Sequence, residues 1–288
     1  MPTSLNEQGY INLLSDVLME GERRKTRNAE TLSIFGAQLR FNCQESFPLL
    51  TSKRVFFRGI IEELLWFLRG DTDAKHLQEK DVHIWDGNSS REYLDSIGLN
   101  HYEVGDCGPV YGYQWRKWNK PYNSDTGGYD QFAEVVRLIK ENPTSRRIFM
   151  SGWNPEQFSE MCLPPCHVSY QFYVDSNDRL SVSLYQRSAD LFLGLPFNIA
   201  STAALLYILC NLCDKKPGDV IISIGDAHIY CDHIDQVKQQ LFNPLYNFPT
   251  MRLDKKCNTI EDVESLQYSD FKLENYQCNK GIKAKMVV

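Results

Sequence analysis

The chain has 288 residues, of which 42% are hydrophobic and 24% are charged. This balance is typical of a globular protein, so the sequence excludes the disordered and fibrous classes. The formal net charge is -6, from 31 Lys and Arg residues against 37 Asp and Glu residues, whereas a chain whose whole surface binds nucleic acid is expected to be basic. We therefore expect the local basic clusters to bind something smaller, and we expect no nucleic-acid partner.

The sequence carries no sign of export or of several domains. Residues 1–15 lack the basic segment followed by an apolar run that marks a targeting peptide. The nine cysteines are odd in number and scattered, unlike the dense, even pattern of a disulfide-bonded secreted protein. No linker or repeat divides the chain. We expect a cytoplasmic protein with reduced thiols and a single domain, residues 1–288, with surface insertions near 88–107 and 117–130.

Helices are predicted in four segments. Apolar residues recur at helical spacing in residues 8–21, and Gly21 is expected to end that helix. The segment 58–69 is strongly apolar, and a further helix is expected at 129–141. The longest apolar run, 199–213, is interrupted by polar residues and is shorter than the roughly 20 residues that span a bilayer. We expect a buried core helix there and no membrane partner.

Strand-like runs alternate with these helices. A charged loop is expected at 22–30 and a strand at 31–42, while residues 88–130 are rich in the Gly, Asn, Asp and Ser residues of surface loops. Four more strands are predicted from β-branched and alternating residues: 146–153, 168–174, 180–186 and 220–225. A mixed sheet packed against long helices follows, so the predicted fold class is α+β.

One cysteine differs from the others in its surroundings. The sequence Leu-Pro-Pro-Cys-His places Cys166 after two prolines, whose fixed φ angles make a stiff lead-in between two predicted strands. Nearby cations stabilise a reactive thiolate, and Arg146, Arg147 and Arg187 lie at the ends of predicted strands. Arginines and the hydroxyl of Ser188 also suit a phosphate. The alternative is a buried, inert thiol with solvated surface arginines.

A carboxyl group, that of Glu63, lies within the second predicted helix. At helical spacing its neighbours are Ile60 and Phe67, whereas Glu62 has Arg58 four residues before it. Glu63 is therefore expected to face the apolar side. Such a group either has a raised pKa and moves protons or is a core acid with satisfied hydrogen bonds, and nothing local separates the two.

His228 and Tyr230 lie on one side of an extended segment, because side chains alternate with period two. Such a pair can hold a sugar hydroxyl. Another possibility is a zinc site, since Cys210, Cys213, His228 and His233 have the spacing of a zinc finger. The two cysteines, however, lie within the predicted core helix, and a buried strand fills the interval. We therefore expect core thiols and no metal.

Motifs spread along nearly the whole chain form a pattern that is specific as a set. They are Leu32-Ser-Ile-Phe-Gly36, Glu63-Leu-Leu-Trp66, His83-Ile-Trp-Asp86, Gly108-Pro-Val-Tyr-Gly112, Arg146-Arg147, Leu163-Pro-Pro-Cys-His167, Gln171-Phe-Tyr-Val174, Tyr185-Gln-Arg-Ser188, Asp190, Leu193-Gly194, Pro196-Phe-Asn-Ile-Ala200 and Gly225-Asp-Ala-His-Ile-Tyr230. With these motifs the chain closely resembles the thymidylate synthase family.

The resemblance implies a thymidylate-synthase-like fold and a twofold homodimer in which a face of the sheet forms the contact. It also implies an activity, the reductive methylation of deoxyuridine monophosphate (dUMP) to thymidylate (dTMP). The one-carbon unit and the hydride come from 5,10-methylenetetrahydrofolate, which is released as dihydrofolate. Folate is then a co-substrate, and no metal is required.

The resemblance further assigns roles to individual residues. Cys166 is the nucleophile that attacks ring carbon six, and the polar network that handles protons contains Glu63, Tyr111, His167 and His228. The dUMP contacts are Arg27, Arg146, Arg147, Gln186, Arg187, Ser188, Asn198, His228 and Tyr230, with Arg146 and Arg147 donated by the partner subunit. The folate contacts are Trp85, Asn88, Asp190, Gly194, Phe197 and Val287.

Four positions depart from the family's pattern. In the loop 25–30 the arginine expected for the phosphate is shifted by one place, and Arg27 is our choice for that role. The loop also lacks two glycines, which changes its permitted φ angles. Val287 replaces an alanine in the tail that closes over folate, and we expect this bulkier residue to slow closure or product release. Cys107 replaces a leucine and Ala189 a cysteine, which we interpret as packing changes.

Two alternative functions stay open at this point. A pyrimidine-nucleotide (dUMP) hydroxymethylase would quench the same intermediate with water, but the folate contacts and the retained tail favour hydride transfer. The other alternative is an RNA-binding, inactive relative. An acidic chain without basic runs interleaved with aromatic residues is a poor RNA binder.

Overall fold

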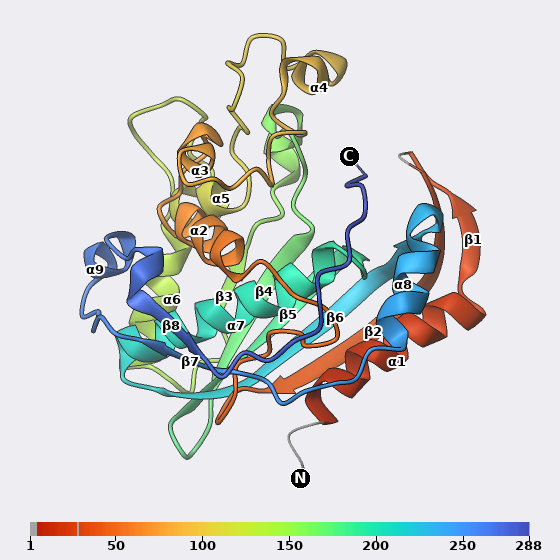
Figure 1. Ribbon diagram of the computed structural model, residues 1–288. Helices are drawn as coiled ribbons and strands as arrows, with labels where there is room; N and C mark the ends of the chain where they lie inside the picture. The colour runs from red at the N-terminus through yellow and green to blue at the C-terminus, as the bar shows by residue number, and fades with distance from the viewer. Residues whose placement is uncertain (1–4, 28, 288) are drawn as a thin grey trace.

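A six-stranded mixed sheet forms the centre of the computed structural model, which describes residues 5–27 and 29–287 (Figure 1). The strand order is β1-β2-β6-β5-β4-β3, and β5 and β6 pair in parallel while the other neighbours are antiparallel. The strands are β1 (Glu22–Lys25), β2 (Glu30–Asn42), β3 (Phe149–Ser151), β4 (His167–Val174), β5 (Arg179–Asp190) and β6 (Lys216–Tyr230). A separate small sheet pairs β7 (Thr250–Leu253) with β8 (Phe271–Glu274).

Helices α2 and α7 lie together over the sheet, and α3, α4 and α5 lie above them in the view of Figure 1. The helices are α1 (Leu5–Glu20), α2 (Phe57–Leu68), α3 (Lys75–Gln78), α4 (Arg91–Ser96), α5 (Gly112–Lys117), α6 (Gln131–Glu141), α7 (Gly194–Cys213), α8 (Ile234–Leu241) and α9 (Ile260–Glu264). Three short 3₁₀ turns complete the set: η1 (Pro155–Glu160), η2 (Cys231–His233) and η3 (Tyr268–Asp270). Helix α7 packs on β5, β6 and α2, and α1 packs on β2.

Helix α7 is the core helix that the sequence predicts at 199–213. In the part of the chain that the structure describes, it alone is long and apolar enough to cross a membrane, but 78% of its most apolar window is buried. Its apolar side chains cover β5, where Leu180, Val182 and Leu184 alternate on the buried face. In this fold α7 is therefore the centre of a protein core.

The opposite face of the sheet carries exposed aromatic side chains. Phe149 lies opposite Gln171, and Tyr185 lies opposite Ser169, so both share a face with Tyr173, two residues beyond Gln171. Phe149, Tyr173 and Tyr185 are 48%, 68% and 44% exposed. All three rings are thus partly open to solvent, and Phe149 also lines a cavity together with residues of α6.

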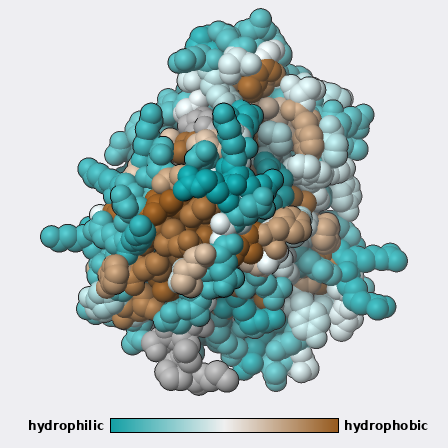
Figure 2. Space-filling view, turned by 90° about the vertical axis from the view of Figure 1, so that its right-hand side faces the viewer, coloured by the Kyte–Doolittle hydropathy of each residue, from teal (hydrophilic) through white to brown (hydrophobic). Residues whose placement is uncertain are grey.

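The flank of the molecule that carries β1 and α8 also has a hydrophobic area. Figure 2 shows this flank with hydrophobic side chains gathered in its left half among hydrophilic ones. Scattered apolar exposure is normal for a protein surface, whereas a continuous area marks a place where something is covered or bound.

The sequence predicts most of the elements and misses the irregular ones. The predicted α+β class, the helices at 8–21, 58–69 and 129–141 and the long strands are confirmed. The charged loop at 22–30 is wrong in part, because residues 22–25 form the edge strand β1. The loop region 88–130 also contains α4 and α5.

One further sequence prediction needs correction, and Glu62 has a partner that its helical spacing does not indicate. The strand predicted at 146–153 shortens to the three residues of β3, because the chain turns at Ser145, whose hydroxyl accepts a hydrogen bond from the backbone N–H of Arg147. The carboxylate of Glu62 forms no ion pair with Arg58. This carboxylate pairs with Lys80 at 2.7 Å and is nearly buried.

Candidate active site

The backbone fixes Cys166 at the start of β4. Its N–H donates to the hydroxyl of Tyr111 at 2.8 Å, and its carbonyl accepts from the N–H of Arg187 on β5 at 3.0 Å. Cys166 is partly exposed, whereas six of the nine cysteines are buried. The lead-in of two prolines thus presents one accessible thiol on a rigid support.

Arg187 holds the same loop from the other side. Its Nε donates to the carbonyl of Pro165 at 2.9 Å and its Nη2 to that of Pro164 at 2.8 Å. The guanidinium also lies 5.6 Å from the ring centre of Trp153. Because a guanidinium has five N–H donors, three remain for an anion next to Cys166.

Glu63 lies inside α2 as the sequence predicts, with its side chain only 9% exposed. The indole Nε1 of Trp85 donates to its Oε1 at 2.8 Å. Burial raises the pKa of Glu63 to about 7, and the bond from Trp85 opposes this shift. A carboxyl group with a pKa near neutrality can both release and take up a proton.

Tyr111 links Glu63 and Trp85 to the cysteine. Its ring stacks on Phe67 at 4.9 Å between ring centres and meets Trp85 edge-on at 5.7 Å. The backbone of Tyr111 has φ 34° and ψ -93°, an unusual conformation that costs on the order of 1–3 kcal/mol. Such strain is typical of functional positions, since the surrounding packing must maintain it.

His167 and Asn198 form the next part of the site. His167 is 5% exposed, and burial lowers its pKa to about 4, although a hydrogen bond with Asn198 opposes this shift. The Nδ1 of His167 lies 3.1 Å from the hydroxyl of Tyr170, and its ring lies 5.4 Å from that of Tyr111. The imidazole is therefore neutral at physiological pH.

Gln186 orients the amide of Asn198 in the first turns of α7. Its Nε2 donates to Asn198 Oδ1 at 2.8 Å and to the carbonyl of Ser188 at 3.0 Å. Its own Oε1 is buried without a hydrogen-bond partner among the described residues. An amide held in this way presents one donor and one acceptor to a flat polar ligand.

The carboxyl ends of β5 and β6 bring another predicted group together. Asp190 pairs with His228 in the parallel register, and the rings of His228 and Tyr230 lie 5.2 Å apart. Asp190 Oδ1 accepts from the backbone N–H groups of Phe192 at 2.9 Å and Leu193 at 3.3 Å. Both of these hydrogen bonds go to Oδ1, and in the described part of the chain we find none to the second carboxylate oxygen.

The remaining residues predicted for folate come from several segments, and of these Gly194 lies next to Asp190. Trp85 is nearly buried, Asn88 is half-buried three residues beyond it, and Gly194 and Phe197 begin α7 with partial exposure. Val287 is half-buried in the C-terminal tail. The tail is anchored by the His233 Nε2, which bonds to the carbonyl of Lys285 at 2.9 Å.

Sequence reasoning missed Lys53 and the role of His233. Lys53 is 5% exposed, and its Nζ donates to the carbonyl of Phe192 and lies over the ring of that residue. Burial lowers the pKa of Lys53 to about 7, while the charge of Asp190 opposes the shift. A lysine inside the apolar segment 47–57 was the available signal.

Two predicted arginines, Arg146 and Arg147, stand apart from Cys166, whereas Arg27 lies close enough to Tyr230 to act on the same side chain as Cys166 does. Arg27 lies beyond β1, and its charge helps to lower the pKa of Tyr230, which burial raises; its neighbour Asn28 is outside the described residues. Arg146 and Arg147 are exposed at the far end of β3. Because β3 and β4 are antiparallel, Arg147 lies roughly 20 Å along the strand direction from Cys166.

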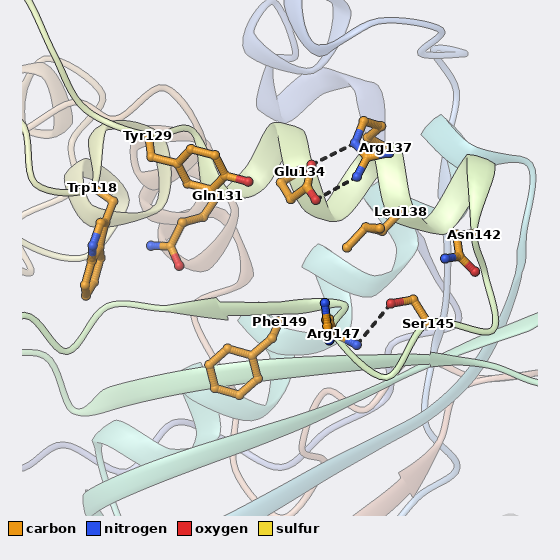
Figure 3. Close-up of a pocket in the computed structure, with 10 residues that line it drawn as sticks. All are labelled: Trp118, Tyr129, Gln131, Glu134, Arg137, Leu138, Asn142, Ser145, Arg147 and Phe149. Carbon is orange, nitrogen blue, oxygen red and sulfur yellow. Dashed lines mark hydrogen bonds and ion pairs between the residues drawn. The ribbon is translucent and has the colours of Figure 1, made fainter.

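A cavity beside Arg147 is separate from the cysteine (Figure 3). It has a volume of about 470 Å³ and lies between α6 and the β3 end of the sheet. At the upper edge of the cavity in Figure 3, the guanidinium of Arg137 donates two hydrogen bonds of 2.8 Å to the carboxylate of Glu134. Arg147 has no carboxylate partner among the described residues, so its charge is available to another molecule.

The zinc alternative does not fit the structure. Cys210 and Cys213 lie in α7, where burial raises the pKa of both thiols, whereas His228 lies in β6 and His233 in η2. Among residues 5–27 and 29–287, no three His, Cys, Asp or Glu side chains gather as a metal site. Cys210 and Cys213 are core thiols, as expected.

The side chains around Cys166 define the chemical class of the site. An accessible thiol on a fixed loop, a buried carboxyl with a pKa of about 7 and a neutral imidazole are the groups that covalent catalysis with proton transfer requires. The thymidylate synthase family model matches residues 8–288, and the chain belongs to this family.

Named relatives agree with the family. The chain is 49% identical over 288 residues to the bifunctional dihydrofolate reductase-thymidylate synthase of Zea mays, covering 98% of this chain and 54% of that protein. It is 50% identical over 285 residues to an Arabidopsis thaliana protein of the same type, covering 97% and 54%. The thymidylate synthase of Saccharomyces cerevisiae is 47% identical over 298 residues, covering 98% and 97%. The chain thus spans about half the length of the bifunctional relatives.

Proposed function

We propose that the protein is a thymidylate synthase that converts dUMP to dTMP with 5,10-methylenetetrahydrofolate as donor of the one-carbon unit and the hydride. The observation that carries the proposal is the hydrogen bond between Cys166 and Tyr111, whose ring packs on Trp85. Trp85 in turn bonds to Glu63, which has a pKa of about 7. A yeast relative of nearly the same length is named for this activity. One core cluster that includes residues of both sheets supports a single domain.

Cys166 is the nucleophile of the proposed reaction. Its thiolate adds to ring carbon six of uracil and turns ring carbon five into a nucleophile that attacks the methylene group of folate. The guanidinium of Arg187, held beside the cysteine loop, stabilises negative charge there. The thioether bond breaks again when the product leaves.

Glu63, Tyr111 and His228 handle the proton of ring carbon five. Glu63 at a pKa of about 7 exchanges protons at neutral pH. Tyr111 connects the site of Glu63 and Trp85 to the backbone of Cys166. The neutral His167 serves as an uncharged hydrogen-bonding group in the same network.

Asn198 reads the pyrimidine, and Gln186 fixes the direction of its amide. An acceptor and a donor on neighbouring atoms match the ring N–H and the adjacent carbonyl of uracil. His228 and Tyr230 at the end of β6 hold the deoxyribose hydroxyl. Ser188 and Arg187 bind the phosphate, together with Arg27 from the altered loop.

Arg146 and Arg147 complete the phosphate site of a second copy in a twofold homodimer. Their distance from Cys166 of the same chain supports this role, because one chain cannot bring both to one dUMP. The exposed aromatic side chains on β3, β4 and β5 supply the contact face. A twofold axis through this face makes each subunit donate to the other.

Folate binds between Asp190, Trp85 and the C-terminal tail as a co-substrate, with Asn88, Gly194, Phe197 and Val287 around it. The second carboxylate oxygen of Asp190 accepts from ring N–H groups, and the aromatic residues supply stacking faces. The reaction needs no metal. We place the enzyme in the cytoplasm and assign it neither a membrane nor a nucleic-acid partner.

The experiment follows two products at once. Purified protein is mixed with dUMP tritiated at ring carbon five and methylenetetrahydrofolate, and tritium release and dihydrofolate absorbance are recorded. The proposal predicts that both rise in step. Tritium release without dihydrofolate would point to a hydroxymethylase or to stalled hydride transfer. Neither signal, together with RNA retention in a filter-binding assay, would favour the RNA-binding alternative.

A further inference from the structure

An ion pair joins two strands of the sheet that are not neighbours. Arg24 on β1 reaches across β2, and its Nη1 lies 3.0 Å from Oδ2 of Asp226 on β6. The two side chains are 51% and 29% exposed. An isolated ion pair at such exposure contributes little to stability. We therefore ask which neighbouring groups this ion pair holds in place.

The second oxygen of Asp226 faces the predicted nucleotide site. Oδ1 lies 3.1 Å from Nδ1 of His228. The bonds from His228 and, to a lesser degree, the charge of Arg24 lower the pKa of Asp226. Because a carboxylate only accepts hydrogen bonds, Nδ1 must carry the proton, and Nε2 of the neutral ring is then an acceptor.

The position of Arg24 in the chain adds a second link. Arg24 pairs with Thr31, and Thr31 pairs with Tyr230, so this end of β1 is level with the end of β6, with β2 between them. The loop that carries Arg27 begins two residues after Arg24. The ion pair therefore fastens the base of that loop to the strand that carries His228.

We propose that Arg24 and Asp226 are positioning residues of the nucleotide site, through which the sugar hydroxyl is recognised. Asp226 holds His228 in the tautomer that is protonated at Nδ1, so that Nε2 accepts a hydrogen bond from the 3′-hydroxyl of the deoxyribose. Arg24 holds Asp226 in the required orientation and anchors the loop of Arg27. The inference rests on the proposed function for the identity of the ligand, and only on the structure for the tautomer.

Two similar ion pairs provide matched controls. Arg40 and Asp219 pair at 2.7 Å between β2 and β6, with exposures of 61% and 26%, but Asp219 has no bond to a histidine. Arg23 is next to Arg24 on β1 and pairs with Glu30 at 2.9 Å. If the Arg24 pair were a surface ion pair only, its loss would have the same effect as the loss of either control pair.

The first test reads the tautomer in the free protein. The six histidines are labelled with ¹⁵N, and the signal of His228 is identified by its absence in His228→Gln. The proposal predicts an Nδ1-protonated ring in the wild type and in Arg40→Gln, and a mixture of tautomers in Asp226→Ala. An Nε2-protonated ring in the wild type, or an unchanged ring in folded Asp226→Ala, would overturn it.

The second test compares dUMP with its 3′-deoxy analogue. We expect Asp226→Ala to raise the KM for dUMP about fivefold, the effect of one lost hydrogen bond. The preference of the wild type for dUMP over the analogue should nearly disappear in this variant. Arg24→Gln should show about a two- to threefold rise, Arg24→Lys a smaller one, and Arg23→Gln none.

The outcomes separate the two proposals. If the wild type neither binds nor converts dUMP, the proposed function fails while the tautomer result still stands or falls alone. If the wild type converts dUMP but Asp226→Ala keeps the full preference for the 3′-hydroxyl, the function stands and the positioning role is refuted.

Discussion

The residues around Cys166 and the arginines beyond β3 differ in how the chain holds them. Cys166, Tyr111 and Glu63 are fixed by backbone bonds, ring stacking and burial within one chain. Arg146 and Arg147 are exposed and have no carboxylate partner in the described part of the chain. The first group is preorganised for chemistry, and the second is available for a ligand that the same chain cannot place there.

The difference follows from the energetics of burial. Removing Glu63 and His167 from water shifts their pKa values in opposite directions, to about 7 and about 4, and both shifts favour the neutral form. The strongly hydrated charges of the two arginines stay at the surface at no such cost. A site that needs both kinds of group is most easily assembled from two surfaces.

The largest effect is expected at the nucleophile. Cys166→Ala should lower turnover by about 10⁴-fold or more, because no other group can form the covalent bond. Binding of dUMP should remain, since the arginines and Asn198 are untouched. Calorimetry with dUMP alone and the dihydrofolate assay measure the two properties, and Cys231→Ala, at another partly exposed cysteine, serves as the control. Turnover by the alanine variant would refute covalent catalysis.

Glu63→Gln should give the next largest effect, a loss of about 10²- to 10⁴-fold in kcat. The same substitution also changes the free energy of unfolding, and the change depends on pH. The pKa of Glu63 is about 7 in the folded protein against an ordinary 4.5, so the folded state binds the proton more tightly. Stability contributed by this group is lost as the pH rises from about 4.5 through 7, by about 3 kcal/mol in total.

Urea unfolding of Glu63→Gln checks this sign. Relative to the wild type, the variant should gain stability between pH 5 and pH 8, because glutamine never ionises. Glu62→Gln is the matched control, since Glu62 is paired with Lys80 and shows the cost of losing an ion pair. An equal difference between Glu63→Gln and wild type at both pH values would contradict the raised pKa.

A smaller loss is expected when the shared arginines are removed one at a time. Arg147→Ala should raise the KM for dUMP by roughly 10- to 100-fold, the effect of one charge-assisted hydrogen bond. Arg137→Ala changes the same cavity but removes an arginine that is paired with Glu134 and Glu141. It should leave KM unchanged. Equal effects of both substitutions would show that the cavity matters only for folding.

The smallest effect is expected in the tail. Val287→Ala should raise kcat by about twofold if closure or product release limits turnover. Stopped-flow measurement of dihydrofolate release provides the check. Unchanged turnover would remove Val287 from the account without affecting the rest of the site.

Much of the site could be predicted from the sequence because its residues are local. The two prolines before Cys166, the apolar surroundings of Glu63 and the spacing of His228 and Tyr230 are properties of short segments. The strand β1 could not be predicted in this way, because Glu22–Lys25 has four exposed, charged side chains and is extended only through pairing with β2.

The unpredicted features depend on contacts between distant segments. The pair of Arg24 and Asp226 is separated by 202 residues, and the bond from Trp85 to Glu63 crosses from a turn to a helix. The separation of Arg147 from Cys166 follows from the antiparallel pairing of β3 and β4. The pattern of residues within one short segment does not indicate which distant segments it contacts or how far apart they lie.

The central claim is that one working site takes Cys166 from one chain and Arg146 and Arg147 from the other chain. The most direct measurement mixes Cys166→Ala and Arg147→Ala chains, each nearly inactive at low dUMP, and isolates the mixed dimer with two affinity tags. The account predicts one intact site per mixed dimer and therefore about half of the wild-type activity. Mixed dimers that remain as inactive as the two parents would show that each chain builds its own site.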